Sequence, residues 1–204
     1  MKLSSDMKKL ALVSTLLAMP VTLVSAAVAD PAFEVTPVSA YELPGDLIHS
    51  PSNIKWEPYG KNKQAKIVDS EGVPGEMAIQ IKVKRKAKNP WDVRMRAPFE
   101  QDVKAGDAID VYFWVRAESY PKGKEAGEIG VALGRNVKPH DTAVDATIYP
   151  TSEWKMYKVS GIAGADFPVD ESDMGFNIGH LKQTIEFGPF FAVKVEQAAA
   201  EGNS

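Results

Sequence analysis

The stretch "KNPWDVRMRAPF" at residues 88–99 brings together residue types that can bind a polar ligand. Asp92, Arg94 and Arg96 alternate with apolar residues, so an extended strand would carry all three on one face. A guanidinium presents a planar fork of donors, and a carboxylate presents two acceptor oxygens. We therefore expect this face to bind paired hydroxyl groups or a carboxylate.

Trp91, in the same stretch, has two interpretations. By alternation it falls on the side of Val93, which is the side expected to face a core. The preceding Asn89 and Pro90 favour a different position, because the proline ring fixes its own φ and holds the residue before it extended. Such a kink would turn the indole toward the mouth of the strand. Core packing and ligand contact both remain open for Trp91.

The next candidate strand, "DVYFWVR" at residues 110–116, carries Tyr112, Trp114 and Arg116 on one face. If it pairs with the strand of Arg94 and Arg96, the two faces form one surface of rings, guanidinium groups and a carboxylate. Aromatic rings stack on the apolar C–H face of a pyranose, and planar polar groups bind its hydroxyls. The pattern thus predicts a sugar-binding groove, although Trp114 is equally compatible with packing in a core.

Small residues suggest where the floor of such a groove would lie. Two further runs present them on one face of a strand, and Asn177 and Gln183 near the second run would be amide partners for hydroxyl groups. The small-residue faces consist of Gly130, Ala132 and Gly134 in the first run, and of Gly175 and Gly179 around Asn177 in the second. The alternative is that these glycines mark close packing between strands.

The elements that must position these residues are strands. Apolar and polar residues alternate with a period of two in seven runs, and Pro- or Gly-containing turn signals separate many of them. The runs cover residues 77–83, 110–116, 129–134, 144–149, 154–162, 175–181 and 184–195. The chain lacks a long run of helical period, so the pattern predicts an all-β fold, an antiparallel β-sandwich of the jelly-roll type. We expect helix in less than about a tenth of the exported chain, against roughly a third in ordinary soluble proteins.

Four segments in this order resemble a known group of proteins. They are "NPWDVRM" at 89–95, "KAGDAIDVYFWVRAES" at 104–119, "SEWKMYKVSG" at 152–161 and "FNIGHLKQTIEFGPFFAV" at 176–193. Together they resemble the jelly-roll carbohydrate-binding modules of families four, nine and twenty-two, which are galactose-binding-like β-sandwiches that accompany polysaccharide-degrading enzymes. The resemblance covers residues 56–195 and implies non-catalytic binding of polysaccharide or oligosaccharide.

The resemblance also bears on metal binding. Modules of this group often hold calcium near the two chain ends and often carry Asp in the last strand. Here the last strand, "IEFGPFFAVKV", has no Asp, so no cofactor is expected and the metal ligands are unknown. Asp46 and Glu186 could still supply oxygen ligands to a structural calcium.

The ends of the chain read as segments outside the folded domain. Lys8 and Lys9, an apolar run and the small residues Ala27-Val28-Ala29 have the layout of a secretory signal peptide at 1–29. The alternative, a membrane anchor, requires about 20 apolar residues, more than this run has. We expect an extended leader at 30–46, a binding domain at 47–196 and a disordered tail at 197–204. The mature chain would be periplasmic or secreted and have no membrane span; its oligomeric state is unknown.

Charge and composition exclude several classes of function. Removing residues 1–29 takes away three lysines and one aspartate, so 24 basic and 27 acidic residues become 21 and 26, a formal charge of −5. Such a surface does not suit nucleic acid, which is bound by neutralising phosphates. The absence of cysteine excludes disulfides and a thiol nucleophile, and export without disulfides is typical of bacterial proteins.

Three hypotheses on function remain. The chain is a non-catalytic carbohydrate-binding module, a structural or envelope protein on the same fold, or a jelly-roll polysaccharide lyase. The candidate residues of the lyase are Arg94, Arg96, Tyr112 and His180, with arginine neutralising a uronate while Tyr or His moves the proton. Known catalytic motifs such as G-x-S-x-G and the P-loop are absent, and the three histidines have no metal-ligand spacing, so we expect no enzyme activity.

Overall fold

The structure, a computed structural model, describes residues 45–53 and 55–195, and these form two antiparallel sheets. Sheet A has the order β3-β4-β11-β6-β9, with β1 paired to β11, and sheet B has the order β2-β5-β10-β7-β8. The strands of sheet A are β1 (Asp46–His49), β3 (Lys63–Asp69), β4 (Met77–Val83), β6 (Ala108–Ser119), β9 (Lys155–Ile162) and β11 (Thr184–Val195). The strands of sheet B are β2 (Glu57–Tyr59), β5 (Arg94–Pro98), β7 (Ile129–Arg135), β8 (Thr142–Ile148) and β10 (Ser172–Asn177).

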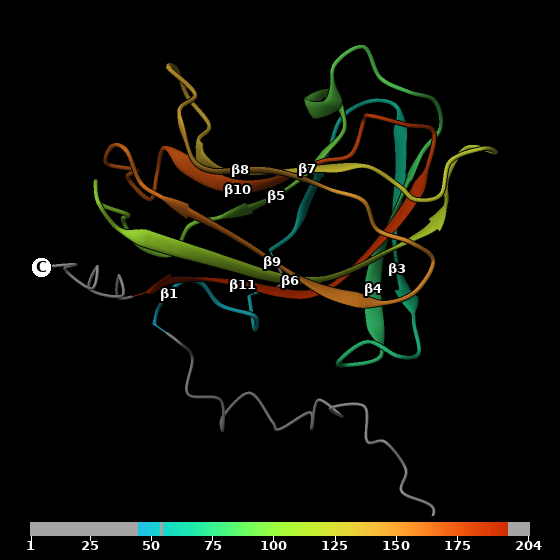
Figure 1. Ribbon diagram of the computed structural model, residues 1–204, viewed down its shortest axis with the longest axis horizontal. Coiled ribbons are helices and arrows are strands. Elements are labelled where there is room, and N and C mark those ends of the chain that lie inside the picture. Colours follow the sequence, from blue (N-terminus) through green and yellow to red (C-terminus); the bar gives the residue numbers. More distant parts are fainter. Residues whose placement is uncertain (1–44, 54, 196–204) are drawn as a thin grey trace, which may run out of the picture. The chain divides into compact units, whose positions relative to one another are not determined.

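The two sheets stack face to face around a single apolar core (Figure 1). In Figure 1, β5, β7, β8 and β10 lie in the upper layer, and β1, β6, β9 and β11 lie in the lower layer. Phe176 of β10 joins the layers, because its ring lies 5.0 Å from those of both Phe113 of β6 and Phe187 of β11. All three rings are buried. The inward faces of the two sheets thus supply the core, and their outward faces remain as the surfaces on which a ligand could bind.

The predicted fold class is confirmed as an all-β antiparallel sandwich of the jelly-roll type. Among the described residues, the one helical element is the three-residue 3-10 turn η2 (Pro90–Asp92). The run predicted at 175–181 is shorter in the structure, because β10 ends at Asn177 and the chain then turns through residues 178–183.

The expected pairing of the two candidate strands is wrong. β5 pairs with β2 and β10 in sheet B, whereas β6 pairs with β9 and β11 in sheet A. The connection between them is anchored in the core by Phe99 and Val103, which are 4% and 0% exposed. Burying these two side chains carries the chain from one sheet to the other, so consecutive strands are not neighbours.

Some expectations lie outside the described residues. The signal peptide at 1–29, the leader up to residue 44 and the tail at 197–204 fall there. Within the described part of the chain, no helix has the length and apolar character needed to cross a membrane.

Candidate functional site

The outward face of sheet B brings three of the predicted site residues together. Arg94 of β5 lies opposite Tyr59 of β2 on one side and Asn177 of β10 on the other. One pair of residues further along β5, Arg96 lies opposite Glu57 and Gly175 in the same way. Arg94, Arg96 and Asn177 therefore share one surface, as alternation predicted for the two arginines.

Arg94 lies flat across this surface. A Cβ at position 175 would stand 1.8 Å from its Nε, so Arg94 occupies the space that a larger residue would fill. The Nη2 of Arg94 donates to Oδ1 of Asp173 at 2.6 Å. Burial lowers the pKa of Arg94, and the attraction of Asp173 opposes that change. Burial likewise raises the pKa of Asp173, against the attraction of Arg94 and Arg96.

Arg96 is held by carboxylates as well. Its Nη2 donates to Oε2 of Glu57 at 2.8 Å, and its Nη1 lies 3.7 Å from Oδ2 of Asp173. Its guanidinium carbon also lies 5.7 Å from the centre of the Tyr59 ring, within the range of a cation–π contact. Both arginines therefore have carboxylate partners within the protein, and a ligand meets a face whose positive charges are already paired.

The trough expected from the small residues is largely filled. Gly175 is covered by Arg94, Gly179 lies against the backbone of the η2 turn, and Gly134 lies against the carbonyl of Asp141. Gly130 has ordinary contacts, because a Cβ there would stand 3.4 Å from both Asn177 and His180. The alternative given above, close packing, therefore explains Gly134, Gly175 and Gly179.

Trp91 leaves the core. Its side chain is 57% exposed, and it sits in η2, which Figure 1 shows as a green coil at one end of sheet B. Asn89 is extended, with φ −118° and ψ 145°, as the following proline requires. The turn is fixed to the sheet because the N–H of Gly179 donates to the carbonyl of Pro90 at 2.9 Å.

Asp92 does not share the strand face of the arginines. It belongs to η2, where its Oδ2 accepts a hydrogen bond from the backbone N–H of Asn89 at 2.9 Å. The strand begins only at Arg94. Asp92 is thus a turn residue that holds Trp91 in place. The expectation that it shares a strand face with the arginines is wrong, because the alternation of a strand applies only from Arg94 on.

Two exposed aromatic residues were not predicted. Tyr59 ends β2 and Tyr149 follows β8, and they are 58% and 61% exposed. The strand registers place both at the end of sheet B where η2 carries Trp91. Tyr149 extends the outward series of Asp145 and Thr147, so alternation within the strand provided a usable signal for it.

Tyr112, Trp114 and Arg116 lie on the outward face of the other sheet, so the expected single surface with Arg94 and Arg96 does not exist. Tyr112 stacks on Phe191 at 4.8 Å and donates to Oδ2 of Asp110 at 3.2 Å. β5 and β6 follow each other in the chain but belong to different sheets, and periodicity alone does not reveal that.

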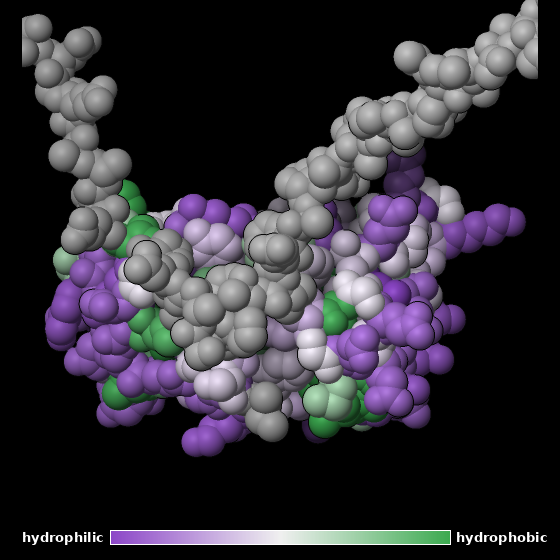
Figure 2. Space-filling model, turned by 90° about the horizontal axis from the view of Figure 1, so that it is seen from below, coloured by the Kyte–Doolittle hydropathy of each residue, from purple (hydrophilic) through white to green (hydrophobic). Residues whose placement is uncertain are grey.

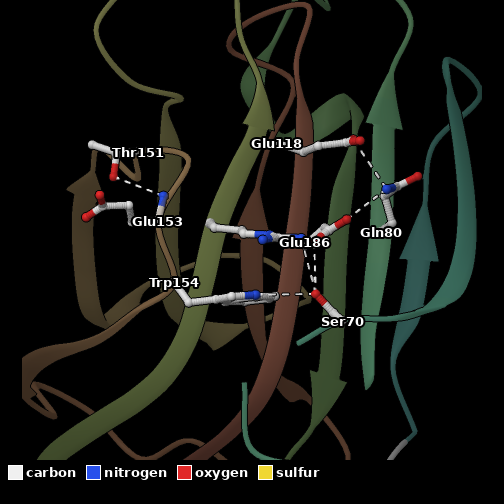
Figure 3. A network of polar contacts seen from close by, with 8 residues as sticks. Ser70, Gln80, Glu118, Thr151, Glu153, Trp154 and Glu186 are labelled. Atoms are coloured by element: carbon white, nitrogen blue, oxygen red, sulfur yellow. Dashed lines mark hydrogen bonds and ion pairs between the residues drawn. The ribbon is translucent and has the colours of Figure 1, made fainter. Parts of the chain in front are cut away.

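Arg116 belongs to a polar network that crosses sheet A (Figure 3). Its Nε donates to Oε2 of Glu186 at 2.7 Å, and its guanidinium lies over the ring of Trp154 at 5.0 Å. Gln80 donates to the other oxygen of Glu186 at 2.8 Å, and the indole N–H of Trp154 donates to Ser70 at 3.3 Å. Each of these polar groups has a partner within the network.

A shallow cavity of about 770 Å³ borders this network. Its lining is Asp69, Ser70, Glu71, Gly75, Glu76, Met77 and Arg116.

Figure 2 views the molecule from the side of sheet A. Outside the part drawn in grey, that side is mostly hydrophilic, with apolar side chains in small separate groups.

Gln183 does not face the groove that the sequence predicted, because its side chain is buried. It is 2% exposed, its Nε2 donates to the carbonyls of Glu128 and Ile178, and its Oε1 accepts from the N–H of Glu128. The amide therefore supplies the hydrogen-bond partners of backbone groups at Glu128 and Ile178. A glutamine in a loop pattern carries no sign of such burial, so only the packed structure identifies this role.

The oxygen ligands expected for calcium do not meet. Asp46 pairs with Lys194 at the far end of β11 from Glu186, about 25 Å away at the usual rise per residue. Glu186 is 3% exposed and already accepts from Arg116, Gln80 and Ser70. The described residues also contain no group of three or more His, Asp or Glu side chains arranged to hold an ion. Asp46 and Glu186 do not fit a shared calcium site.

Comparison with solved structures gives similar folds at low sequence identity. A structure described as "CBM4 structure and function" superposes with a TM-score of 0.54 at 16% identity and covers 68% of this chain and 94% of its own. The second N-terminal cellulose-binding domain of Cellulomonas fimi β-1,4-glucanase C gives 0.53 at 18% identity, covering 76% and 94%. The CBM22-1 xylan-binding domain of Paenibacillus barcinonensis Xyn10C gives 0.52 at 13%, covering 78% and 100%.

The chain has the jelly-roll fold of carbohydrate-binding modules. The sequence matches no protein-family model and no curated protein. The fold resemblance stated from the sequence is therefore confirmed by structure alone.

Within this carbohydrate-binding-module fold, buried polar atoms without partners are concentrated at one place. Among the described residues, nine buried side-chain polar atoms make no hydrogen bond, and six of them belong to β5, β10 or the turn after β10. The six are Arg94 Nε, Arg96 Nε, Ser172 Oγ, Asp173 Oδ2, Asn177 Oδ1 and His180 Nε2. Because most buried polar atoms in proteins have a partner, such a concentration suggests bound water or a ligand.

Proposed function

We propose that the chain is an exported, non-catalytic carbohydrate-binding protein that binds polysaccharide or oligosaccharide on the outward face of sheet B. The observation that carries this proposal is the gathering of unpaired polar atoms on β5 and β10. A sugar supplies many hydroxyl groups that both donate and accept, so it can satisfy such atoms with little charge of its own. Sheet A offers a poorer site, because its central network is satisfied internally.

The aromatic residues at the η2 end give the face its apolar component. Trp91 and Tyr59 are more than half exposed, which leaves their rings free to stack on the C–H face of a sugar ring. Asn177 is the next neighbour of Arg94 across the sheet, and its Oδ1 is buried without a hydrogen-bond partner, so a hydroxyl group that displaces the side chain covering it would find an acceptor there. Stacking at one end and hydrogen bonds from the sheet together are the elements of a sugar site.

The two alternative functions differ in what supports them. The residue set of the lyase comes together only in part, because Tyr112 is on sheet A, whereas Arg94 and Arg96 are on sheet B and His180 follows β10 of that sheet. The structural or envelope role assigns no particular residues a function, so the positions of the side chains do not test it. Incubation of the purified chain with a panel of polysaccharides separates all three. Retention without new reducing or unsaturated chain ends supports binding, new ends support the lyase, and neither result supports the structural role.

Export is the second part of the proposal, and it rests on the basic, apolar and small residues at 1–29. Cleavage after Ala29 would make Asp30 the first residue of the mature chain. We expect mass spectrometry of protein recovered from outside the cytoplasm to give the mass of residues 30–204. A mass that includes Met1 or Met7 would contradict this part while leaving the binding face untouched.

The replacement Trp91→Ala tests the binding face. A stacked aromatic residue is commonly a hot spot, so we expect a loss of about 2 kcal/mol or more in binding, a roughly 30-fold weaker affinity. Since the side chain is 57% exposed, the unfolding free energy should change by less than about 0.5 kcal/mol. Affinity electrophoresis and thermal melting measure the two effects on one preparation.

Trp114→Ala is the matched control, because it removes the same side chain from the outward face of sheet A. It should leave polysaccharide retention unchanged. Equal loss of retention in both variants, or normal retention in Trp91→Ala, would show that the η2 end of sheet B is not the site.

A further inference from the structure

Val193 of β11 is fully buried although its side chain points away from the core. It is 0% exposed, and the residue before it, Ala192, belongs to the core cluster, whereas Val193 does not. Because side chains alternate along a strand, Val193 lies on the outward face of sheet A. Its partner Asp110 is also outward, where it accepts hydrogen bonds from the hydroxyls of Tyr112 and Ser160, and it is only 6% exposed. Two neighbouring outward positions are therefore closed to solvent.

The side chains around Val193 form an apolar surface. The strand registers place three rows of residues across β11, β6 and β9, with Leu47 of β1 beside Val193. The apolar and aromatic members, which we call the Val193 surface, are Leu47, Ala108, Tyr112, Ile162, Phe191, Val193 and Val195. Ile162 is 61% exposed, so the surface is open at its β9 edge and closed at its centre.

The described residues supply no second layer of strands over the Val193 surface, because sheet B packs on the other side of sheet A. The loop at residues 70–76 does fold over the outward face, but near Trp114. A Cβ at Gly188 would stand 2.3 Å from Val73 of this loop and 3.1 Å from Trp114. Trp114 is four positions from the partner of Val193 on β6, a distance of about 13 Å. The strands and this loop therefore do not account for the burial of Val193.

The chain leaves the described residues directly beside this surface. It bends at Gly45, and a Cβ there would stand 1.7 Å from the carbonyl oxygen of Lys194, so the backbone passes against β11. Residues 36–44 therefore start next to Val195. Fully extended, they reach about 30 Å, whereas the surface extends roughly 13 Å along β11 from Phe191 to Val195. The segment is long enough to cross the surface.

The sequence of residues 36–44, "TPVSAYELP", suits the Val193 surface. Tyr41 and Leu43 flank Glu42, so an extended segment carries two large apolar side chains on one side and the carboxylate on the other. Prolines at both ends of the segment disfavour a helix. The tail at 196–204, "EQAAAEGNS", follows the last strand at the same end but has no apolar side chain larger than alanine. Residues 36–44 therefore gain more than the tail by burying apolar area.

We propose that residues 36–44 lie extended on the outward face of sheet A and cover Val193 with the side chains of Tyr41 and Leu43. The segment then closes this part of sheet A to ligands and belongs to the folded domain, although the sequence pattern alone separates it as a leader. The proposal does not depend on the function proposed above.

The absence of cysteine allows the cover to be measured with single thiols. Val193→Cys places a thiol under the proposed cover, and Ile162→Cys places one at the exposed edge of the same surface. An aromatic disulfide reagent reacts only with an accessible thiolate. We expect the thiol of Val193→Cys to react at least about tenfold more slowly, because the cover must open first. Equal rates in the two variants would overturn the proposal.

Substitutions in residues 36–44 test whether this segment is the cover. Adding Tyr41→Ser and Leu43→Ser to Val193→Cys should raise the reaction rate at least about tenfold, because they weaken the cover. Glu42→Gln is the matched control, since its side chain faces away from the surface, and it should leave the rate unchanged. A rate that both changes leave alone would overturn the proposal. A rate that falls as protein concentration rises would overturn it as well, by assigning the cover to a second copy of the chain.

A second measurement holds even if the serine variants fail to fold. A nitroxide attached through Glu42→Cys should broaden the methyl resonances of Val193 and leave the indole resonance of Trp91, at the far end of the other sheet, sharp. Sharp Val193 resonances would overturn the proposal whatever the thiol rates are.

Discussion

At the scale of single residues, the site depends on a glycine that makes room for an arginine. The guanidinium of Arg94 lies where a Cβ at position 175 would be, and from there it reaches Asp173 at 2.6 Å. Asp173 is almost completely buried, so it depends on this partner to remain charged at low cost. Gly175 therefore serves both the stability of sheet B and the flatness of its outward face.

Gly175→Ala should displace Arg94 and leave Asp173 without its closest partner. Breaking a buried ion pair is costly, so we expect the free energy of unfolding to fall by about 3 kcal/mol. Urea denaturation measures this change. Gly164→Ala is the control, since a Cβ there has no atom within 4 Å and should change stability little. Equal stability of the two variants would mean that Arg94 relocates without losing Asp173.

At the scale of elements, three strands of sheet A are joined on their outward side. Gln80 of β4, Glu186 of β11 and Arg116 of β6 form a continuous row of hydrogen bonds, and Trp154 covers the guanidinium. Glu186 is 3% exposed, which makes it a buried charge held by its neighbours. Arg116, which was expected to share the sugar-binding surface, thus serves to hold the sheet together.

Arg116→Ala would leave Glu186 buried without its cationic partner. We expect a loss of about 3 kcal/mol in unfolding free energy and unchanged polysaccharide retention, because sheet B is not touched. Lys104→Ala provides the contrast, since its pair with Asp166 is exposed to solvent and its loss should change stability little. A stability loss in Arg116→Ala no larger than in Lys104→Ala would show that water replaces the arginine.

At the scale of the whole molecule, the first described strand, β1, is fastened to the sandwich by a buried histidine. His49 is 1% exposed, stacks on Phe190 at 4.7 Å, and its Nδ1 lies 3.1 Å from the carbonyl of Pro98, to which it donates. Burial lowers the pKa of His49, while the Pro98 carbonyl and the Glu100 carboxylate oppose this effect. The folded chain therefore holds His49 in its neutral form.

The lowered pKa predicts a loss of stability in mild acid. Below about pH 6.5 the unfolded chain takes up a proton that folded His49 resists. The stabilising contribution is present above that pH and is lost as the pH falls toward the lower pKa of the folded state. Melting temperatures between pH 7.5 and 5.5 should fall more steeply for the wild type than for His49→Gln, whose amide can still donate to Pro98. Parallel curves for the two proteins would contradict the prediction.

The sequence by itself determined the class of the fold and the local direction of many side chains. Alternation of period two is a local property, so it correctly placed Val93 on the side of the core and Arg94 and Arg96 on the opposite, outward face. The restriction that Pro90 places on Asn89 is also local, and the exposed position of Trp91 agrees with it.

Only the tertiary structure decided which strands are neighbours. β5 and β6 follow each other in the chain, yet the burial of Phe99 and Val103 between them carries the chain from sheet B to sheet A. Alternation says which face a side chain takes but not which sheet the strand joins, and that choice depends on packing between residues far apart in sequence. For the same reason the pairing of Arg94 with Asp173, 79 residues away, and the burial of Gln183 could not be read from the sequence.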